Sequence, residues 1–216
     1  MKKQIIFAAV AAVGITSLIA APVTQAALTD SSLFSQQITA GTLSTAIRNS
    51  GDTADVAAPN VPFTALSVST ACQTSTGTYG TNTERIYVDN PGASATGWTL
   101  ALAATGGATA KWVSGSNNYA FNSAAGSGCT SGQLTINPAA GSVNPVSPAT
   151  TTGITLGSSA SFVSGTTDSI TLVNAAAASD DIWRGYILGI GASQKVPANT
   201  PVGSYSIDMT QTVAAQ

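Results

Sequence analysis

The sequence has no histidine, only two cysteines and few charged residues. Lysine and arginine number seven and aspartate and glutamate nine, so that charged residues occupy 7 % of the 216 positions, against roughly 25 % in ordinary soluble domains. Histidine is the side chain that most often transfers protons or binds metals near neutral pH. Two thiols without histidine also make a poor zinc site. The composition therefore argues against histidine-dependent catalysis, and we expect no metal and no cofactor.

Catalysis without histidine would need a serine–lysine pair or paired carboxylates. Ser193-Gln194-Lys195 lacks the Ser-x-x-Lys spacing of such pairs. Asp180, Asp181 and Asp208 could act as acids, bases or calcium ligands, but they lack the alternating Asp/Asn spacing that surrounds one calcium ion with oxygens. We therefore expect a protein that is not an enzyme.

Residues 1–26 have the organisation of a secretory signal peptide. Lys2 and Lys3 give a positive start, residues 5–21 are uncharged and mostly apolar, and Thr24-Gln25-Ala26 supplies the small residues that a signal peptidase requires. We expect cleavage after Ala26, with an uncleaved membrane anchor as the alternative. No later apolar run has spanning length. The mature chain is therefore expected to be secreted, extracellular or at the cell surface, without membrane insertion.

The expected mature chain, residues 27–216, is mildly acidic. Loss of Lys2 and Lys3 leaves five basic and nine acidic residues, a net charge of −4. An acidic surface repels phosphate groups, so nucleic acids and anionic membranes are poor partners. The 44 % of hydrophobic residues also argues against disorder, which requires low hydrophobicity and high net charge.

The two cysteines, Cys72 and Cys129, form an even set in a chain that we expect to be exported. Export to an oxidising compartment favours one disulfide between them. Closing a loop of this length would stabilise the fold by about 4 kcal/mol in the chain-entropy model.

Hydrophobic residues alternate with period two, which is typical of half-buried β-strands. The clearest cases are 98–104 and 205–213, and turn-forming residues such as Asp89-Asn90-Pro91-Gly92 separate the segments. This pattern predicts an all-β antiparallel β-sandwich, of jelly-roll or immunoglobulin-like type. The other expected strands are 38–47, 63–69, 85–89, 133–136, 154–156, 161–163, 169–173 and 183–190, and the expected loops are 49–62, 137–152, 175–181 and 196–203.

Two stretches resemble the WxL domains of bacterial cell surfaces. Residues 85–92 (RIYVDNPG) lead to 97–100 (GWTL), which is similar to the family's first Trp-x-Leu block, and 196–205 (VPANTPVGSY) resembles its last hairpin. The resemblance spans residues 63–213 and implies a secreted β-sandwich held non-covalently on cell-wall polysaccharide or peptidoglycan. The family's second Trp-x-Leu is missing, because residues 210–213 read TQTV.

The mature N-terminus resembles a different family. Residues 27–31 (ALTDS) followed by 38–43 (ITAGTL) are similar to the start of camelysin-like biofilm-matrix proteins. That resemblance implies a fibre subunit that lends its N-terminal strand to another copy of itself. We therefore expect one sandwich domain over 27–216, with an N-terminal strand and linker at 27–62 and a WxL-like body at 63–216.

Five large residues are candidates for contact with wall glycan. Trp98 and Leu100 belong to the Trp-x-Leu block but could equally be core residues of a strand. Trp112 and Tyr119, with Lys111 and asparagines nearby, combine aromatic and polar groups as carbohydrate sites do, and Trp183 is the remaining tryptophan. The alternative for these three residues is that they pack between the sheets. Exposure of Trp112 and Trp183 would favour a glycan-binding module over an assembly subunit.

Overall fold

The computed structural model describes residues 33–125 and 130–216. Its regular structure there is β-strand apart from short 3-10 turns, and all strand pairs are antiparallel, so the predicted all-β sandwich is confirmed. One compact unit, Thr39–Gln216, contains all the strands, and residues 33–38 have no regular structure. The strands are β1 (Ser44–Arg48), β2 (Gln73–Tyr79), β3 (Arg85–Pro91), β4 (Trp98–Ala104), β5 (Lys111–Ser114), β6 (Asn117–Ala120), β7 (Gln133–Asn137), β8 (Ser142–Pro145), β9 (Ile154–Leu156), β10 (Ala160–Ser161), β11 (Ser169–Ala175), β12 (Ile182–Leu188), β13 (Ile190–Val196) and β14 (Met209–Ala215).

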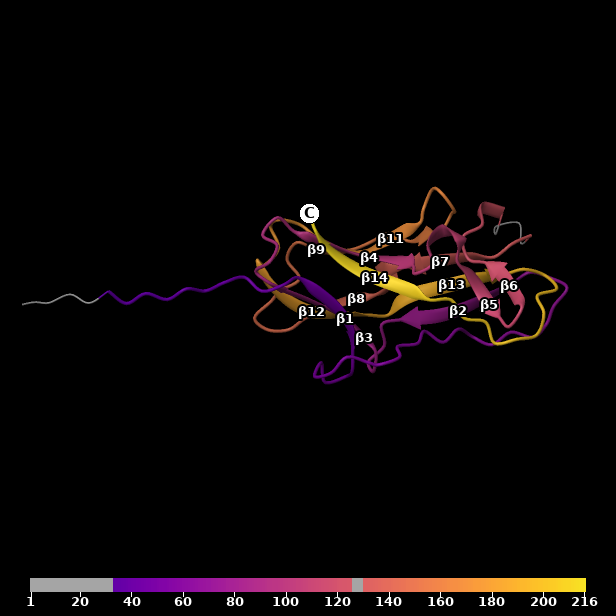
Figure 1. Cartoon of the computed structure of the whole chain (residues 1–216), viewed down its shortest axis with the longest axis horizontal. Helices are drawn as coiled ribbons and strands as arrows, with labels where there is room; N and C mark the ends of the chain where they lie inside the picture. Colours follow the sequence, from indigo (N-terminus) through magenta and orange to yellow (C-terminus); the bar gives the residue numbers. More distant parts are fainter. Residues whose placement is uncertain (1–32, 126–129) are drawn as a thin grey trace, which may run out of the picture. The chain divides into compact units, whose positions relative to one another are not determined.

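Two of the sheets continue into each other to form one long layer. Their strand orders are β1-β3-β12-β8 and β10-β7-β13-β2. Along the chain, β12 is followed by β13 after one residue, β2 by β3 after residues 80–84, and β7 by β8 after a 3-10 turn at Pro138–Ala140. The neighbouring strands β3, β12 and β8 of the first sheet are thus each joined along the chain to β2, β13 and β7, which are neighbours in the second sheet (Figure 1). We call these two sheets the long layer.

Three glycines lie where the long layer passes from one sheet to the other. Gly80 and Gly189 both have φ of +78°, and the Gly189 N–H donates to the Gly80 carbonyl at 2.7 Å. A Cβ on Gly80 would lie 2.7 Å from the Ile187 carbonyl oxygen, and one on Gly141 would lie 2.8 Å from the Leu188 carbonyl oxygen. At Gly80 and Gly141 the backbones therefore approach too closely for a side chain, whereas Gly189 is favoured by its positive φ, since a Cβ there would meet nothing closer than 3.8 Å. We call these three glycines the glycine bend.

The third sheet, β14-β4-β11-β9, packs on the long layer to form the core. β4 alternates buried and partly exposed residues along its whole length, as its sequence predicts. The rings of Trp98 on β4 and Trp183 on β12 are 5.3 Å apart between centroids. Gln211 of β14 donates to the Thr45 hydroxyl of β1 at 2.8 Å, which links the edges of the two layers. Both tryptophans and Leu100 are 0 % exposed.

Several strand predictions are corrected by the structure. Residues 38–43 are outside β1, and the expected strand 63–69 is reduced to one bridge between Phe63 and Gly77. The expected strand 183–190 is divided at Gly189, and the expected loop 137–152 contains β8. Strands β2, β5 and β6 were not predicted: β2 is rich in Ser and Thr, and β5 and β6 are four residues each, too short to show a clear apolar alternation.

The predicted turn after β3 is built around a buried asparagine. Asn90 is 0 % exposed, accepts hydrogen bonds from the Ala93 and Ser94 N–H groups, and donates to the Ser94 and Asp181 carbonyls. β3 continues through Pro91, so the turn begins later than the sequence predicts, at Gly92 with φ of +80°. The asparagine side chain thus replaces the backbone partners that the loop lacks.

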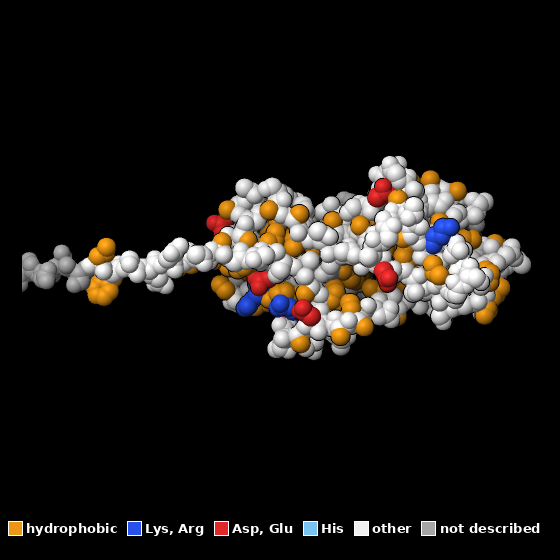
Figure 2. Space-filling model, in the orientation of Figure 1, with side chains coloured by type: hydrophobic (Ala, Val, Ile, Leu, Met, Phe, Trp, Pro, Cys, Tyr) orange, Lys and Arg blue, Asp and Glu red, His pale blue; other side chains and the backbone are white. Residues whose placement is uncertain are grey.

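Two arginines of the long layer pair with aspartates of the loop that follows β1. Arg85 contacts Asp52 at 2.9 Å and lies 4.2 Å from the ring centroid of Tyr186, and Arg48 contacts Asp55 at 3.3 Å. These contacts hold the 49–56 loop, within the predicted 49–62 loop, against the sheet. Figure 2 shows that most of the visible surface is otherwise uncharged.

The predicted signal peptide, residues 1–26, lies outside the described residues. Within 33–125 and 130–216, no helix has the length and apolar character needed to cross a membrane.

Candidate functional site: an uncharged aromatic cavity

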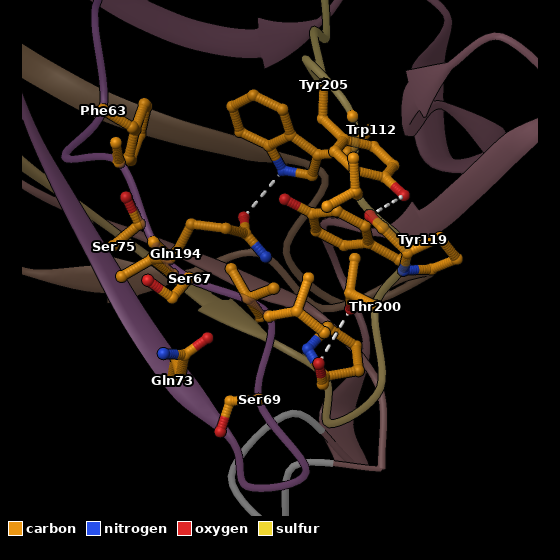
Figure 3. Close-up of a pocket in the computed structure, with 18 of the residues that line it drawn as sticks. Phe63, Ser67, Ser69, Gln73, Ser75, Trp112, Tyr119, Gln194, Thr200 and Tyr205 are labelled. Atoms are coloured by element: carbon orange, nitrogen blue, oxygen red, sulfur yellow. Dashed lines mark hydrogen bonds between the residues drawn. The ribbon is translucent and has the colours of Figure 1, made fainter.

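An open cavity of about 600 Å³ lies at the end of the sandwich where β2 begins and β13 ends. Segment 63–69 and β2 form one side, and the β5–β6 hairpin and the 197–205 loop form the other (Figure 3). The Asn199 N–H donates to the Ser69 carbonyl at 2.8 Å and ties the two sides together. This volume is within the range of small-molecule sites.

Four aromatic rings follow one another along the cavity, and we call them the aromatic series: Phe63, Trp112, Tyr119 and Tyr205. Phe63 meets Trp112 edge-on at 5.4 Å, Trp112 stacks with Tyr119 at 6.2 Å, and Tyr119 lies 5.0 Å from Tyr205. Trp112 and Tyr119 are direct partners across the β5–β6 hairpin, which explains their stacking. The hairpin loop has Gly115 at its first position with φ of +58°, as a type II′ turn requires.

Trp112, the second ring of the aromatic series, is held in place by the buried side-chain amide of Gln194. Gln194 of β13 is 1 % exposed; its Oε1 accepts from the Trp112 Nε1–H at 2.8 Å, and its Nε2 donates to the Lys195 carbonyl at 2.7 Å. Gly132 leaves room for this amide, because a Cβ there would lie 2.9 Å from Gln194 Nε2 and 2.0 Å from the Ala120 carbonyl oxygen. The indole of Trp112 is therefore held in one orientation at the cavity wall.

The described residues that line the cavity include no lysine, arginine, aspartate or glutamate. Their polar groups are hydroxyls and amides, among them Ser67, Ser69, Gln73 and Thr200. Burial, and to a smaller extent the neighbouring Tyr205, raises the pKa of Tyr119 to about 12. The Tyr119 phenol is thus neutral at physiological pH and can donate a hydrogen bond. The hydroxyl and amide groups of the lining can orient a ligand through hydrogen bonds.

The five predicted contact residues separate into two groups. Trp112 and Trp183 are both buried, at 9 % and 0 % exposed, so the exposure that would have favoured a glycan-binding module over an assembly subunit is not observed. Trp112 and the half-buried Tyr119 nevertheless line the cavity. Trp98, Leu100 and Trp183 are 0 % exposed, so their core alternative is correct and their assignment as glycan contacts is wrong. The Trp183 Nε1–H is satisfied internally by the Thr150 carbonyl at 2.8 Å.

Three residues of the site were missed from the sequence. Phe63, Gln194 and Tyr205 come from distant segments, and only the strand pairings bring them together. Ser206 pairs with Val113 through two backbone hydrogen bonds of 2.9 and 3.0 Å, which places Tyr205 beside the hairpin. The Gly-x-Tyr of the 196–205 stretch is a signal for Tyr205, although by itself it indicates only a hairpin.

Of the acidic residues considered for catalysis or calcium, Asp180 has a structural role in a loop. Asp180 accepts from the Thr150 N–H at 2.7 Å and from its hydroxyl at 3.1 Å. Within the part of the chain that the structure describes, no three potential ligand groups of the His, Cys, Asp and Glu types lie together.

Cys129 lies outside the described residues, so its disulfide with Cys72 stays a prediction. Titration of secreted, unreduced protein is expected to find no free thiol, and two thiols after reduction under denaturing conditions. Two reactive thiols before reduction would contradict the pairing.

The chain matches no family model, no curated protein and no solved structure.

Proposed function

We propose that this protein is an exported, non-enzymatic cell-surface protein that associates non-covalently with the cell wall, and that the aromatic cavity holds the wall glycan. The observation that carries the proposal is the placement of Trp112 and Tyr119, together with Tyr205 and Phe63, on an open uncharged cavity. Sites for small ligands commonly combine aromatic walls with a few fixed polar groups. The hydroxyls and amides of this cavity suit a ligand rich in hydroxyl groups.

The WxL-like resemblance is part of the same proposal. The first stretch ends in β4 and the second precedes β14, and these two strands are neighbours, because Leu100 of β4 pairs with Val213 of β14. The Trp-x-Leu residues themselves are buried. We therefore assign wall contact to the cavity rather than to this motif, and the missing second Trp-x-Leu does not remove a residue of the proposed site.

A charge placed on the cavity wall tests the proposal. Val202 lines the cavity and is 81 % exposed, so Val202→Asp should not disturb packing. A bound neutral glycan would cover the new carboxylate without supplying an opposite charge, which is unfavourable. We expect the affinity for purified cell wall, measured by co-sedimentation, to fall at least tenfold.

The matched control is Ile182→Asp. Ile182 is 70 % exposed at the first residue of β12 and does not line the cavity. Both variants should keep the melting temperature of the unmodified protein, and the control should bind wall normally. Equal binding by all three proteins would refute the cavity as the wall site.

A second candidate function, assembly by strand donation, is favoured by a separate observation. Residues 33–38 form no strand, and Leu33, Phe34 and Ile38 are 93 %, 92 % and 87 % exposed. Extended apolar segments of this kind can add to the open edge of another sheet. Under this proposal the partner is a second copy of the chain.

Deletion of residues 27–37 tests strand donation. The mature full-length protein should form filaments at sufficient concentration, whereas the shortened protein should remain a folded monomer. Light scattering and electron microscopy measure the difference. A full-length protein that stays monomeric and still sediments with wall would exclude assembly and leave glycan binding standing.

A further inference from the structure

The cavity has two kinds of lining, and together they restrict its ligand. Hydroxyl and amide groups are supplied by Ser67, Ser69 and Gln73, which Figure 3 shows along one side. Exposed aliphatic side chains lie on the same cavity: Leu66 is 39 % exposed, Val68 62 % and Val202 81 %. Large aliphatic side chains at such exposure in a concave site indicate a ligand with apolar groups of its own.

The absence of charge among the described lining residues restricts the ligand further. A charged group that enters the cavity would lose part of its hydration and find no opposite charge there. Anionic polymers would also meet the net negative charge of the expected mature chain. The ligand is therefore uncharged over the part that enters the cavity.

We propose that the cavity selects a neutral, acetamido-bearing sugar, an inference that rests on the proposed glycan-binding function. An acetamido group joins a methyl to an amide, so one substituent satisfies both kinds of lining. The methyl is removed from water against Val68 and Val202, while the amide N–H and C=O bond to the serine hydroxyls and Gln73. The sugar ring lies against the aromatic series that begins at Phe63.

Three trisaccharides of the same linkage test separately the preference for the acetamido group and the preference for a neutral ligand. Chitotriose carries acetamido groups, cellotriose has hydroxyls in their place, and deacetylated chitotriose has charged amines. Binding is measured calorimetrically on the mature full-length protein. We expect chitotriose to bind at least tenfold more tightly than cellotriose, and the deacetylated sugar to bind more weakly than chitotriose.

The variant Val202→Ser removes one apolar contact without adding charge. It should reduce the preference for chitotriose over cellotriose, while Ile182→Ser, similarly exposed but away from the cavity, should leave the preference unchanged. Equal binding of chitotriose and cellotriose would overturn the acetamido assignment but leave glycan binding intact. Tighter binding of the deacetylated sugar or of an oligogalacturonate would overturn the requirement for neutrality. Failure to bind any of these sugars or purified wall would refute the proposed function itself.

Discussion

Replacement of Trp98 by alanine is expected to lower the free energy of unfolding by about 3–5 kcal/mol, the range for truncation of a core aromatic residue. Trp98 is 0 % exposed, packs on Trp183 at 5.3 Å and lies on the central strand β4, between β14 and β11. The substitution therefore leaves a cavity between the two layers. Chemical denaturation followed by tryptophan fluorescence and circular dichroism measures the loss.

Ile182→Ala is the matched control, because it truncates a large side chain that is 70 % exposed on the strand that carries Trp183. It should change stability by less than about 0.5 kcal/mol, as is usual for surface positions. If Trp98→Ala kept its melting temperature but lost wall binding, Trp98 would be a contact residue and the core assignment would fail.

Replacement of Gly80 by alanine is expected to destabilise the glycine bend strongly. The positive φ of +78° alone costs a non-glycine residue about 1–2 kcal/mol. The new Cβ would also lie 2.7 Å from the Ile187 carbonyl oxygen and 3.0 Å from Ile86 Cδ1, and overpacking of this kind adds about 1–3 kcal/mol. The backbone oxygen cannot move without disturbing β12, so we expect the two costs to add.

Gly107→Ala separates the two costs, since Gly107 has a similar φ of +67° but a Cβ there would meet nothing within 4 Å. It should show only the conformational cost. The difference between the two variants in denaturant unfolding then measures the steric part. Equal destabilisation would mean that the close approach at Gly80 relaxes freely.

Sequence patterns predicted the longer strands in which several large buried residues alternate with smaller ones. β4 and β14 were found because Trp98, Leu100 and Leu102, and later Met209 and Val213, alternate with smaller residues. β2 was missed because its seven residues, QTSTGTY, give no such contrast. The division of β12 from β13 was also missed, since a lone glycine in an apolar run does not reveal the backbone contacts made across the sheet.

The cavity could be predicted only in part for a similar reason. Trp112 and Tyr119 are close in sequence and lie in one hairpin, so their local composition was informative. Gln194 reaches Trp112 across 82 positions, and Phe63 comes from a segment that forms a single bridge. Such contacts follow from strand order, which period-two alternation does not determine.

The glycine bend also has a consequence for how the strands find their alignment. Sliding β2–β3 against β12–β13 by one residue would place a side chain at the position of Gly80, where a Cβ would lie 2.7 Å from the Ile187 carbonyl oxygen. A chain so rich in alanine, serine and threonine distinguishes its two sheet faces weakly, and such strands are prone to slipped pairings. Gly80 and Gly141, through close backbone contacts, and Gly189, through its positive φ, therefore restrict how the strands of the long layer align, so slipped and aggregation-prone pairings are disfavoured.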